Sequence, residues 1–247
     1  MMTFEKFENR VVVSAKLVAV TPIFVGARAD SFKPGAINGS CVKDVYGRPY
    51  IPGSSLKGVM RAFLSCVLDE TPAVKVNDAF KNKDQRDVYQ TPQKLADAVV
   101  AASTTDERLF GSQVMAGKVK IADAIPVEDR VATEVRNGVA IDRDTRTALG
   151  GALFDTEVVP SGTMFDFKAS AENLTSDEAD LFGSLMEYFA DGNITVGGRS
   201  RAGLGNVELR DVSVTIHRAA LKKFLTSETI KCGKSEIREA VKKCSQN

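Results

Sequence analysis

The segment from Gly197 to Gly205 has the composition of a loop that binds a polyanion. It reads GGRSRAGLG, with four glycines and two arginines in nine positions. Glycine admits positive φ and leaves backbone amides uncovered, and the guanidinium of arginine presents a planar set of donors that matches phosphate oxygens. The pattern predicts a phosphate-binding loop, with a tight turn carrying solvated arginines as the alternative. The candidate contacts are Gly197, Gly198, Arg199 and Arg201.

A second cationic segment lies at the start of a predicted helix. After IPG at residues 51–53, apolar residues recur at helical spacing. A helix N-terminus presents unpaired amides and a partial positive charge, which together attract anions. Ser54 or Ser55 is available as the N-cap, and Lys57 and Arg61, four residues apart, share one helix face. We predict a second anion site here, with a capped amphipathic helix and a solvated basic face as the alternative.

The scarcity of histidine and the spacing of cysteine exclude several chemistries. His217 is the only histidine, so a two-histidine ribonuclease is impossible and a Ser–His–Asp triad has no better base. We predict a structural or solvent-facing role for it. The cysteines form no CxxC pair, which argues against zinc and against a disulfide framework: Cys41, Cys66, Cys232 and Cys244.

Composition is that of an ordinary globular chain. Its 247 residues carry a formal net charge of +1, with 43% hydrophobic and 26% charged residues. The net charge hides an excess of lysine and arginine from Arg218 to the C-terminus. We find neither a signal peptide nor an apolar span of about 20 residues. We therefore expect a cytoplasmic protein with no membrane association.

Periodicity places these segments on an α+β framework. Residues 10–20, 118–124 and 206–216 have the alternation of strands, and residues 153–159 and 164–169 are predicted to form a hairpin around Pro160-Ser161-Gly162. Helices are predicted from residue 54 and after a capping box at Thr175 to Glu178. The order strand, helix, strands, helix, strand predicts a ferredoxin-like plan, with helices against one face of a mainly antiparallel sheet.

Four segments in this order resemble a known family. They are IPGSSLKGVMRAFL at 51–64, LFG at 109–111, TEVRNGVAIDRDTRTA at 133–148 and GGRSRAGLG at 197–205. Together they resemble the RAMP superfamily, specifically a type III-A-like backbone subunit of type III CRISPR effector complexes. The resemblance implies one RAMP domain over residues 1–247, with a ferredoxin-like (RRM-like) palm and an inserted β-hairpin thumb. The implied boundaries are about 10–68, 109–130 and 153–216 for the palm, 131–154 for the thumb, and 218–247 for a basic C-terminal extension.

The resemblance also implies a function and a set of partners. Such a subunit repeats along a guide crRNA and positions complementary target RNA, beside neighbouring copies of itself and other type III effector subunits. By position, the loop at 197–205 and the helix start hold guide phosphates, through Ser54, Ser55, Lys57 and Arg61. The thumb residues expected to meet RNA are Ile141, Arg143, Thr145 and Arg146. The alternative for the two thumb arginines is a salt-bridged surface, because Asp142 and Asp144 interleave with them.

Residue 38 departs from the family pattern. The family resembles Gly-Ala-aliphatic-Asp before the IPGSS segment, and that aspartate serves metal-dependent cleavage of target RNA. Here the frame reads Gly35-Ala36-Ile37-Asn38. Asparagine carries no charge, so it binds a hard divalent cation more weakly and cannot act as a general base. We expect a cleavage-deficient subunit, natural or altered at this position. It would need no cofactor, and Mg²⁺ only if cleavage is retained.

The residues of the sequence are compatible with three other functions. The first is an active metal-dependent endoribonuclease that uses Asp30 or Asp44 within the same complex. The second is a guide-precursor processing member of the superfamily, which the lone His217 supports poorly. The third is a metabolic enzyme whose glycine loop binds a small phosphorylated ligand, although GGRSRAGLG does not follow GxGxxG and precedes a strand.

Overall fold

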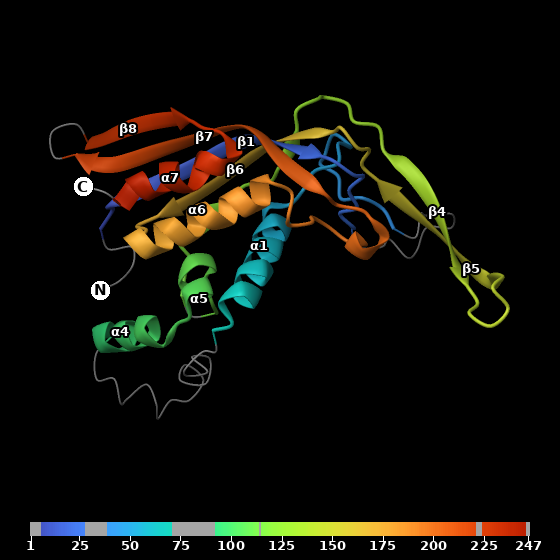
Figure 1. Cartoon of the computed structure of the whole chain (residues 1–247), viewed down its shortest axis with the longest axis horizontal. Coiled ribbons are helices and arrows are strands. Elements are labelled where there is room, and N and C mark those ends of the chain that lie inside the picture. Colours follow the sequence, from blue (N-terminus) through green and yellow to red (C-terminus); the bar gives the residue numbers. More distant parts are fainter. Residues whose placement is uncertain (1–5, 28–38, 71–91, 114, 221–223, 246–247) are drawn as a thin grey trace.

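An antiparallel sheet with strand order β2-β6-β1-β7-β8 forms the centre of the structure, a computed structural model (Figure 1). Residues 6–27, 39–70, 92–113, 115–220 and 224–245 are described. A further short strand, β3, pairs with β6 beside β2. The strands of this sheet are β1 (Asn9–Ala19), β2 (Val119–Ile121), β3 (Ile125–Pro126), β6 (Met164–Glu172), β7 (Val207–Ala220) and β8 (Phe224–Lys231).

Strand β1 lies at the centre of the sheet because its sequence suits a strand with one buried face. In NRVVVSAKLVA, Val11, Val13, Ala15 and Leu17 are buried, and the residues that alternate with them, from Arg10 to Lys16, face the other side. Val13 is aligned with Ala169 of β6 on one side and with Val214 of β7 on the other.

Three helices cover one face of the sheet: α1 (Gly53–Leu68), α6 (Ser176–Ala190) and α7 (Ile237–Lys242) (Figure 1). The core between them and the sheet is mainly aliphatic and includes several phenylalanines, of which Phe167 on β6 and Phe189 on α6 have ring centroids 5.6 Å apart. Beyond the end of α1 lie α4 (Pro92–Ala102) and α5 (Thr105–Phe110). None of the helices in the described ranges is long and apolar enough to cross a membrane. The short 3-10 turns are η1 (Ser200–Ala202), η2 (Lys234–Glu236) and η3 (Lys243–Ser245).

The capping box predicted for the second helix is confirmed. The Glu178 amide donates to Thr175 Oγ1 at 3.3 Å, and the Thr175 amide donates to Glu178 Oε2 at 3.0 Å. Two orphan amides at the start of α6 are thereby satisfied.

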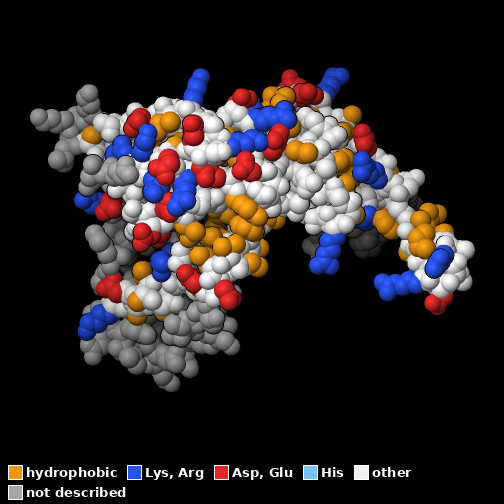
Figure 2. Space-filling view, in the orientation of Figure 1, with side chains coloured by type: hydrophobic (Ala, Val, Ile, Leu, Met, Phe, Trp, Pro, Cys, Tyr) orange, Lys and Arg blue, Asp and Glu red, His pale blue; other side chains and the backbone are white. Residues whose placement is uncertain are grey.

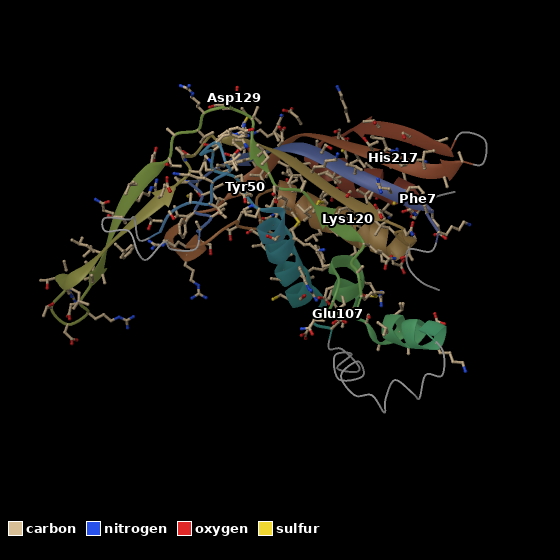
Figure 3. All side chains as sticks on the ribbon, turned by 180° about the vertical axis from the view of Figure 1, so that it is seen from behind. Phe7, Tyr50, Glu107, Lys120, Asp129 and His217 are labelled. Carbon is tan, nitrogen blue, oxygen red and sulfur yellow. The ribbon has the colours of Figure 1, made fainter. Side chains whose placement is uncertain are left out.

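The opposite face of the sheet carries paired charges. Arg10 and Lys120 both bond Glu172 Oε1, at 2.5 and 3.1 Å. His217 lies on the same open face in the view from behind (Figure 3), where its Nδ1 and Ser227 Oγ are 2.7 Å apart across β7 and β8. The histidine therefore has a cross-strand role in the sheet.

The ferredoxin-like plan predicted from the sequence is confirmed. The units β1-α1-β2 and β6-α6-β7 interleave so that β6 lies between β1 and β2, with every neighbouring pair antiparallel. The two helices of these units lie on the same face (Figure 1).

The predicted pairing of residues 153–159 with residues 164–169 is wrong. Strand β5 (Ala148–Val158) pairs instead with β4 (Glu134–Ile141) in a separate hairpin that projects from one end of the molecule (Figure 1). The turn at Pro160-Ser161-Gly162 exists, but other backbones satisfy the groups around it. Ile23 and Val159 exchange two hydrogen bonds of 2.9 and 2.8 Å, and β6 pairs with β1.

The basic C-terminal segment is built into the fold. The expected boundary at 218 falls inside β7, and β8 and α7 follow. Arg238 on α7 donates two bonds of 2.7 Å to the carboxylate of Asp180 on α6. Lys234 bonds Glu208 at 2.7 Å. These cations serve the packing of the segment.

Candidate nucleic-acid interface

The glycine loop, residues Gly197–Gly205, packs closely against the chain that follows β1. The Gly198 amide donates to the Phe24 carbonyl at 2.8 Å, and the Gly205 amide donates to the Pro22 carbonyl at 2.9 Å. Gly197 has φ +87°, and a Cβ there would lie 2.2 Å from the Phe24 carbonyl oxygen. The glycines at 197, 198 and 205 therefore permit close approach of two backbones, and two of the amides expected to be uncovered are used internally.

The two arginines of the loop have different surroundings. Arg199 has φ +58°, in the left-handed region, and its guanidinium lies 4.5 Å from the ring centroid of Phe154 and 5.6 Å from that of Phe24. Arg201 lies in η1 and is exposed. Both arginines are thus exposed, and Arg199 alone lies over aromatic rings.

The start of α1 differs from the prediction in its cap. Pro52 is the N-cap, and no side chain caps the helix. The Gly53 amide donates instead to Asp123 Oδ1 at 2.7 Å. A Cβ on Gly53 would lie 2.2 Å from the Ile121 carbonyl oxygen, so this position against β2 requires a glycine. The helix begins at Gly53, and the two serines therefore lie one and two positions inside it. Ser54 is exposed and Ser55 is half-buried.

Lys57 and Arg61 share one face of α1, but both side chains have partners within the palm. Lys57 Nζ donates to the Val119 carbonyl at 3.0 Å, and burial, followed by the charge of Arg61, lowers the pKa of Lys57. Arg61 Nε lies 3.3 Å from Asp106 Oδ2. These two cations therefore join α1 to β2 and α5.

The tip of the hairpin presents two arginines, Arg143 and Arg146, to solvent. Asp142 Oδ1 accepts hydrogen bonds from the amides of Asp144 and Thr145 at 2.9 and 2.8 Å, and the bond from the Thr145 amide contributes most to lowering the pKa of Asp142. Within the described ranges, Arg143 and Arg146 form no ion pair, and both are exposed, as are Ile141 and Thr145. The tip is therefore not the salt-bridged surface considered as the alternative.

A buried carboxylate ties the base of the hairpin to the palm. Glu157 Oε1 accepts bonds of 2.5 Å from Lys43 Nζ and Thr133 Oγ1, and its Oε2 accepts a bond of 2.9 Å from the Cys41 amide. Burial acts to raise the pKa of Glu157, but these bonds outweigh it and the pKa lies below its ordinary value. The bonds hold the segment after residue 38 against β5.

The segment from Gly39, which follows the residue expected to serve cleavage, bonds to this base. Gly39 donates its amide to the Asp155 carbonyl at 3.1 Å and accepts a bond of 2.7 Å from the Glu157 amide. Asn38 and Asp30 themselves lie outside the described residues. Asp44, the other acid considered for cleavage, closes a turn: its Oδ1 accepts from the amides of Tyr46 and Arg48 at 2.9 Å each, and its Oδ2 from Arg48 Nε at 2.8 Å.

Burial acts to raise the pKa of Asp44, but the bonds from Arg48 lead the effects that lower it below its ordinary value. Both of its oxygens are thus engaged. No group of three or more metal-ligating side chains occurs among the residues that the structure describes.

The predicted site residues form three groups. The glycine loop and the segment at Gly39 meet at the hairpin base, the exposed arginines Arg143 and Arg146 lie at the hairpin tip, and Lys57 and Arg61 face β2 and α5. Figure 2 shows the surface hollowed between α1 and the hairpin. Lysine and arginine side chains project into this hollow over the glycine loop and near the hairpin tip, and an apolar patch lies over α1.

Sequence reasoning missed the residues that organise the hairpin base. Phe24 lies far in the sequence from Phe154 and Glu157, which are both on β5. Their contacts with Arg199 and with the segment at Cys41 form only in the folded state. One sequence signal existed, since Gly138 lies in a strand-like segment and glycine in a strand often marks a close approach. Its partner is Phe154, directly opposite in the hairpin.

The family to which the chain belongs follows from a match over most of its length. A model of the RAMP superfamily matches residues 16–208, from within β1 to the start of β7, including α1, the hairpin and the glycine loop. The chain belongs to the RAMP superfamily, as the sequence motifs predicted.

Comparison with individual proteins shows which members of the superfamily this chain is similar to. The chain is 23% identical to the "CRISPR system Cms endoribonuclease Csm3" of Methanothermobacter thermautotrophicus over 219 residues, which cover 85% of this chain and 87% of the relative. It is 26% identical to the Csm3 of Enterococcus italicus over 215 residues, covering 81% and 89%. It is 31% identical to the "CRISPR system Cmr subunit Cmr6" of Pyrococcus furiosus over 111 residues, covering 35% and 33%.

Proposed function

We propose that this chain is a repeated backbone subunit of a type III CRISPR interference complex, which binds guide crRNA through phosphates and positions target RNA. One observation carries the proposal: a glycine loop bearing two arginines is joined to the base of an exposed cationic hairpin in a RAMP-superfamily chain. The similarity to Csm3 over most of both chains supports the same function. The partners would be other effector subunits, further copies of this chain and both RNAs, in the cytoplasm.

The side chains proposed to contact RNA differ in whether they already have a partner within the protein. Arg143, Arg146 and Arg201 are exposed, so a phosphate would meet them without displacing a protein partner. A phosphate at Lys57 would replace the bond to Val119, and one at Arg61 would compete with Asp106. We propose that the hairpin tip and the glycine loop supply most of the backbone contacts, with Ser54, Ser55 and the two α1 cations as secondary contacts.

Salt dependence of RNA binding tests this proposal. The full chain should retain a labelled single-stranded RNA of arbitrary sequence, with log Kobs falling against log salt by about 0.7 per phosphate contacted. Arg143→Ala and Arg146→Ala should each weaken binding by about tenfold and reduce the slope by about 0.7. Arg210→Ala, on the uncovered face of the sheet and paired with Glu208, is the matched control and should bind as the wild type does.

Two results would contradict the proposal. The first is wild-type protein that shows no salt-sensitive retention of RNA. The second is a loss confined to one RNA sequence in the hairpin variants, because contacts to phosphates act on every sequence alike.

Cleavage of target RNA is the second candidate function, favoured by the word endoribonuclease in the names of the Csm3 relatives. We expect no cleavage of matched target by an assembled complex that carries Asn38, even with Mg²⁺ present. Asn38→Asp restores a charged oxygen ligand and a group able to act as a base, so it should cut at regular intervals only when Mg²⁺ is added. Product lengths on a denaturing gel measure both. Regular cuts by the unaltered chain would establish the endoribonuclease function instead, and failure of the variant would mean that another group is missing.

A further inference from the structure

Arg199 is held between two aromatic rings that come from different parts of the molecule. Its guanidinium carbon lies 4.5 Å from the ring centroid of Phe154, on β5 of the hairpin, and 5.6 Å from that of Phe24, in the chain after β1. A guanidinium within about 6 Å of an aromatic face is attracted by the negative face of the ring. The stack therefore links the glycine loop, the palm and the hairpin at one residue.

Glycines make room for both rings. A Cβ on Gly138 would lie 2.2 Å from the Phe154 ring, so this ring lies directly over the backbone of β4. Cβ atoms on Gly26, Gly39 and Gly198 would lie 3.0, 3.1 and 3.2 Å from the Phe24 ring. Each ring thus packs directly against glycine backbone, in space that a side chain at these positions would occupy.

The guanidinium keeps its hydrogen-bonding edge free. In the ranges that the structure describes, the guanidinium of Arg199 makes neither a hydrogen bond nor an ion pair, and the residue is exposed. Its backbone is in the left-handed region, which a non-glycine residue adopts only where its surroundings impose it. A stacked guanidinium with free N–H groups has lost rotamer freedom before any ligand arrives, which lowers the entropic cost of binding an anion.

We propose that Phe24 and Phe154 are positioning residues, which hold Arg199 as a preoriented receptor for one RNA phosphate and so couple the hairpin to the glycine loop. This inference rests on the proposed function, because it concerns the same RNA. The rings themselves contact the arginine and need not contact RNA. Their removal should weaken RNA binding without removing a charge, and a phosphate bound at Arg199 should stiffen the hairpin base.

Binding measurements separate positioning from direct contact. Phe154→Leu should weaken binding of a labelled single-stranded RNA by about two- to fivefold, with an unchanged salt slope. Arg199→Ala should weaken it more and reduce the slope by about 0.7. Arg199→Lys keeps the charge but loses the stack, so it should behave as Phe154→Leu does. Phe154→Tyr keeps the ring and should bind as the wild type does.

The double variant supplies the decisive comparison. Phe154→Leu combined with Arg199→Ala should bind no more weakly than Arg199→Ala alone, because the ring acts through the arginine. Losses that multiply, or a Phe154→Leu protein that binds as the wild type does, would overturn the proposal. Thermal unfolding of each variant identifies any that loses affinity because it fails to fold. If Phe154→Leu fails to fold, the comparison rests on Phe154→Tyr, which keeps the ring and should keep the wild-type affinity.

A fluorescence experiment tests the stack independently of whether the chain binds RNA. The sequence contains no tryptophan, so the indole introduced by Phe154→Trp reports on this position alone. Acrylamide should quench it less with Arg199 present than in Phe154→Trp/Arg199→Ala, and adding RNA should reduce quenching further only with the arginine present. Equal quenching in the two proteins would refute the stack. Unequal quenching with no RNA bound would instead contradict the proposed function and leave the stack in place.

Discussion

Replacing Lys118 with methionine should lower the free energy of unfolding by about 3 kcal/mol, the largest loss that we expect from a single charged side chain. Lys118 and Glu178 are both buried, and Lys118 Nζ lies 2.5 Å from Glu178 Oε2 and 2.8 Å from the Asn173 carbonyl. Methionine matches the length of the lysine but leaves the Glu178 carboxylate in the interior, with Arg108 Nε 3.7 Å away as its remaining cation. Urea unfolding of the full chain measures the loss.

A second substitution shows whether the loss of stability comes from the unpaired buried charge of Glu178 or from lost packing of Lys118. Glu178→Gln removes the charge and keeps an amide oxygen that can accept from the Thr175 amide, so Lys118→Met/Glu178→Gln should be more stable than Lys118→Met alone. Lys120→Met, two residues further along the chain in β2, is the matched control. Lys120 also pairs with a glutamate, but its side chain is 62% exposed, so its loss should cost only about 0.5 kcal/mol. Equal losses for Lys118→Met and Lys120→Met would contradict the importance of burial.

Sequence patterns predicted the framework because long amphipathic elements carry their own signal. The helix α1 repeats apolar residues at helical spacing, α6 begins at its capping box, and β1 alternates. The element order then led to the ferredoxin-like plan. By contrast, α7 has six residues, of which Ile237, Ala240 and Val241 are buried, and so short a segment shows no periodicity to detect.

The prediction for β5 failed because local pattern does not choose a partner strand. Residues 153–159 alternate, and a turn-forming trio follows them, so a hairpin with residues 164–169 was the simplest local solution. The extended strand instead reaches back to residue 148 and pairs with β4, while Val159 bonds Ile23. The resemblance had implied a hairpin over 131–154, but the alternation of residues 153–159 did not show that they extend its second strand, and Ile23 lies far from Val159 in the sequence.

The partners of the lysine and arginine side chains could not be predicted for the same reason, because they lie on other elements of the fold. The face shared by Lys57 and Arg61 was predicted, but Val119 and Asp106 lie on other elements and convert a solvated basic face into a palm contact. At the hairpin tip the opposite occurred, because Asp142 bonds backbone amides and leaves the arginines without an acid partner in the described ranges. The order of charges along the sequence therefore does not show which cations have a partner in the folded chain.

The glycine loop offers a test of why its glycines are needed. The sequence suggested uncovered amides and flexibility, whereas the structure places Gly197 against the Phe24 carbonyl with φ +87°. Gly197→Ala should lower the free energy of unfolding by about 3 kcal/mol, because it adds left-handed backbone strain to a steric clash with backbone. We also expect RNA affinity to fall by tenfold or more, since the loop must move away from Phe24 and Arg199 moves with it.

Gly203→Ala is the matched control within the same loop. Gly203 has a similar φ of +82°, but a Cβ there would meet nothing within 4 Å. Only the backbone strain then applies, about 1 kcal/mol, and RNA binding should stay close to that of the wild type. Urea unfolding and RNA titration of both variants decide between the two explanations. If the two substitutions weaken RNA binding equally, conformational freedom throughout the loop is what RNA requires; if only Gly197→Ala does, the glycines serve the packing that holds Arg199 in place.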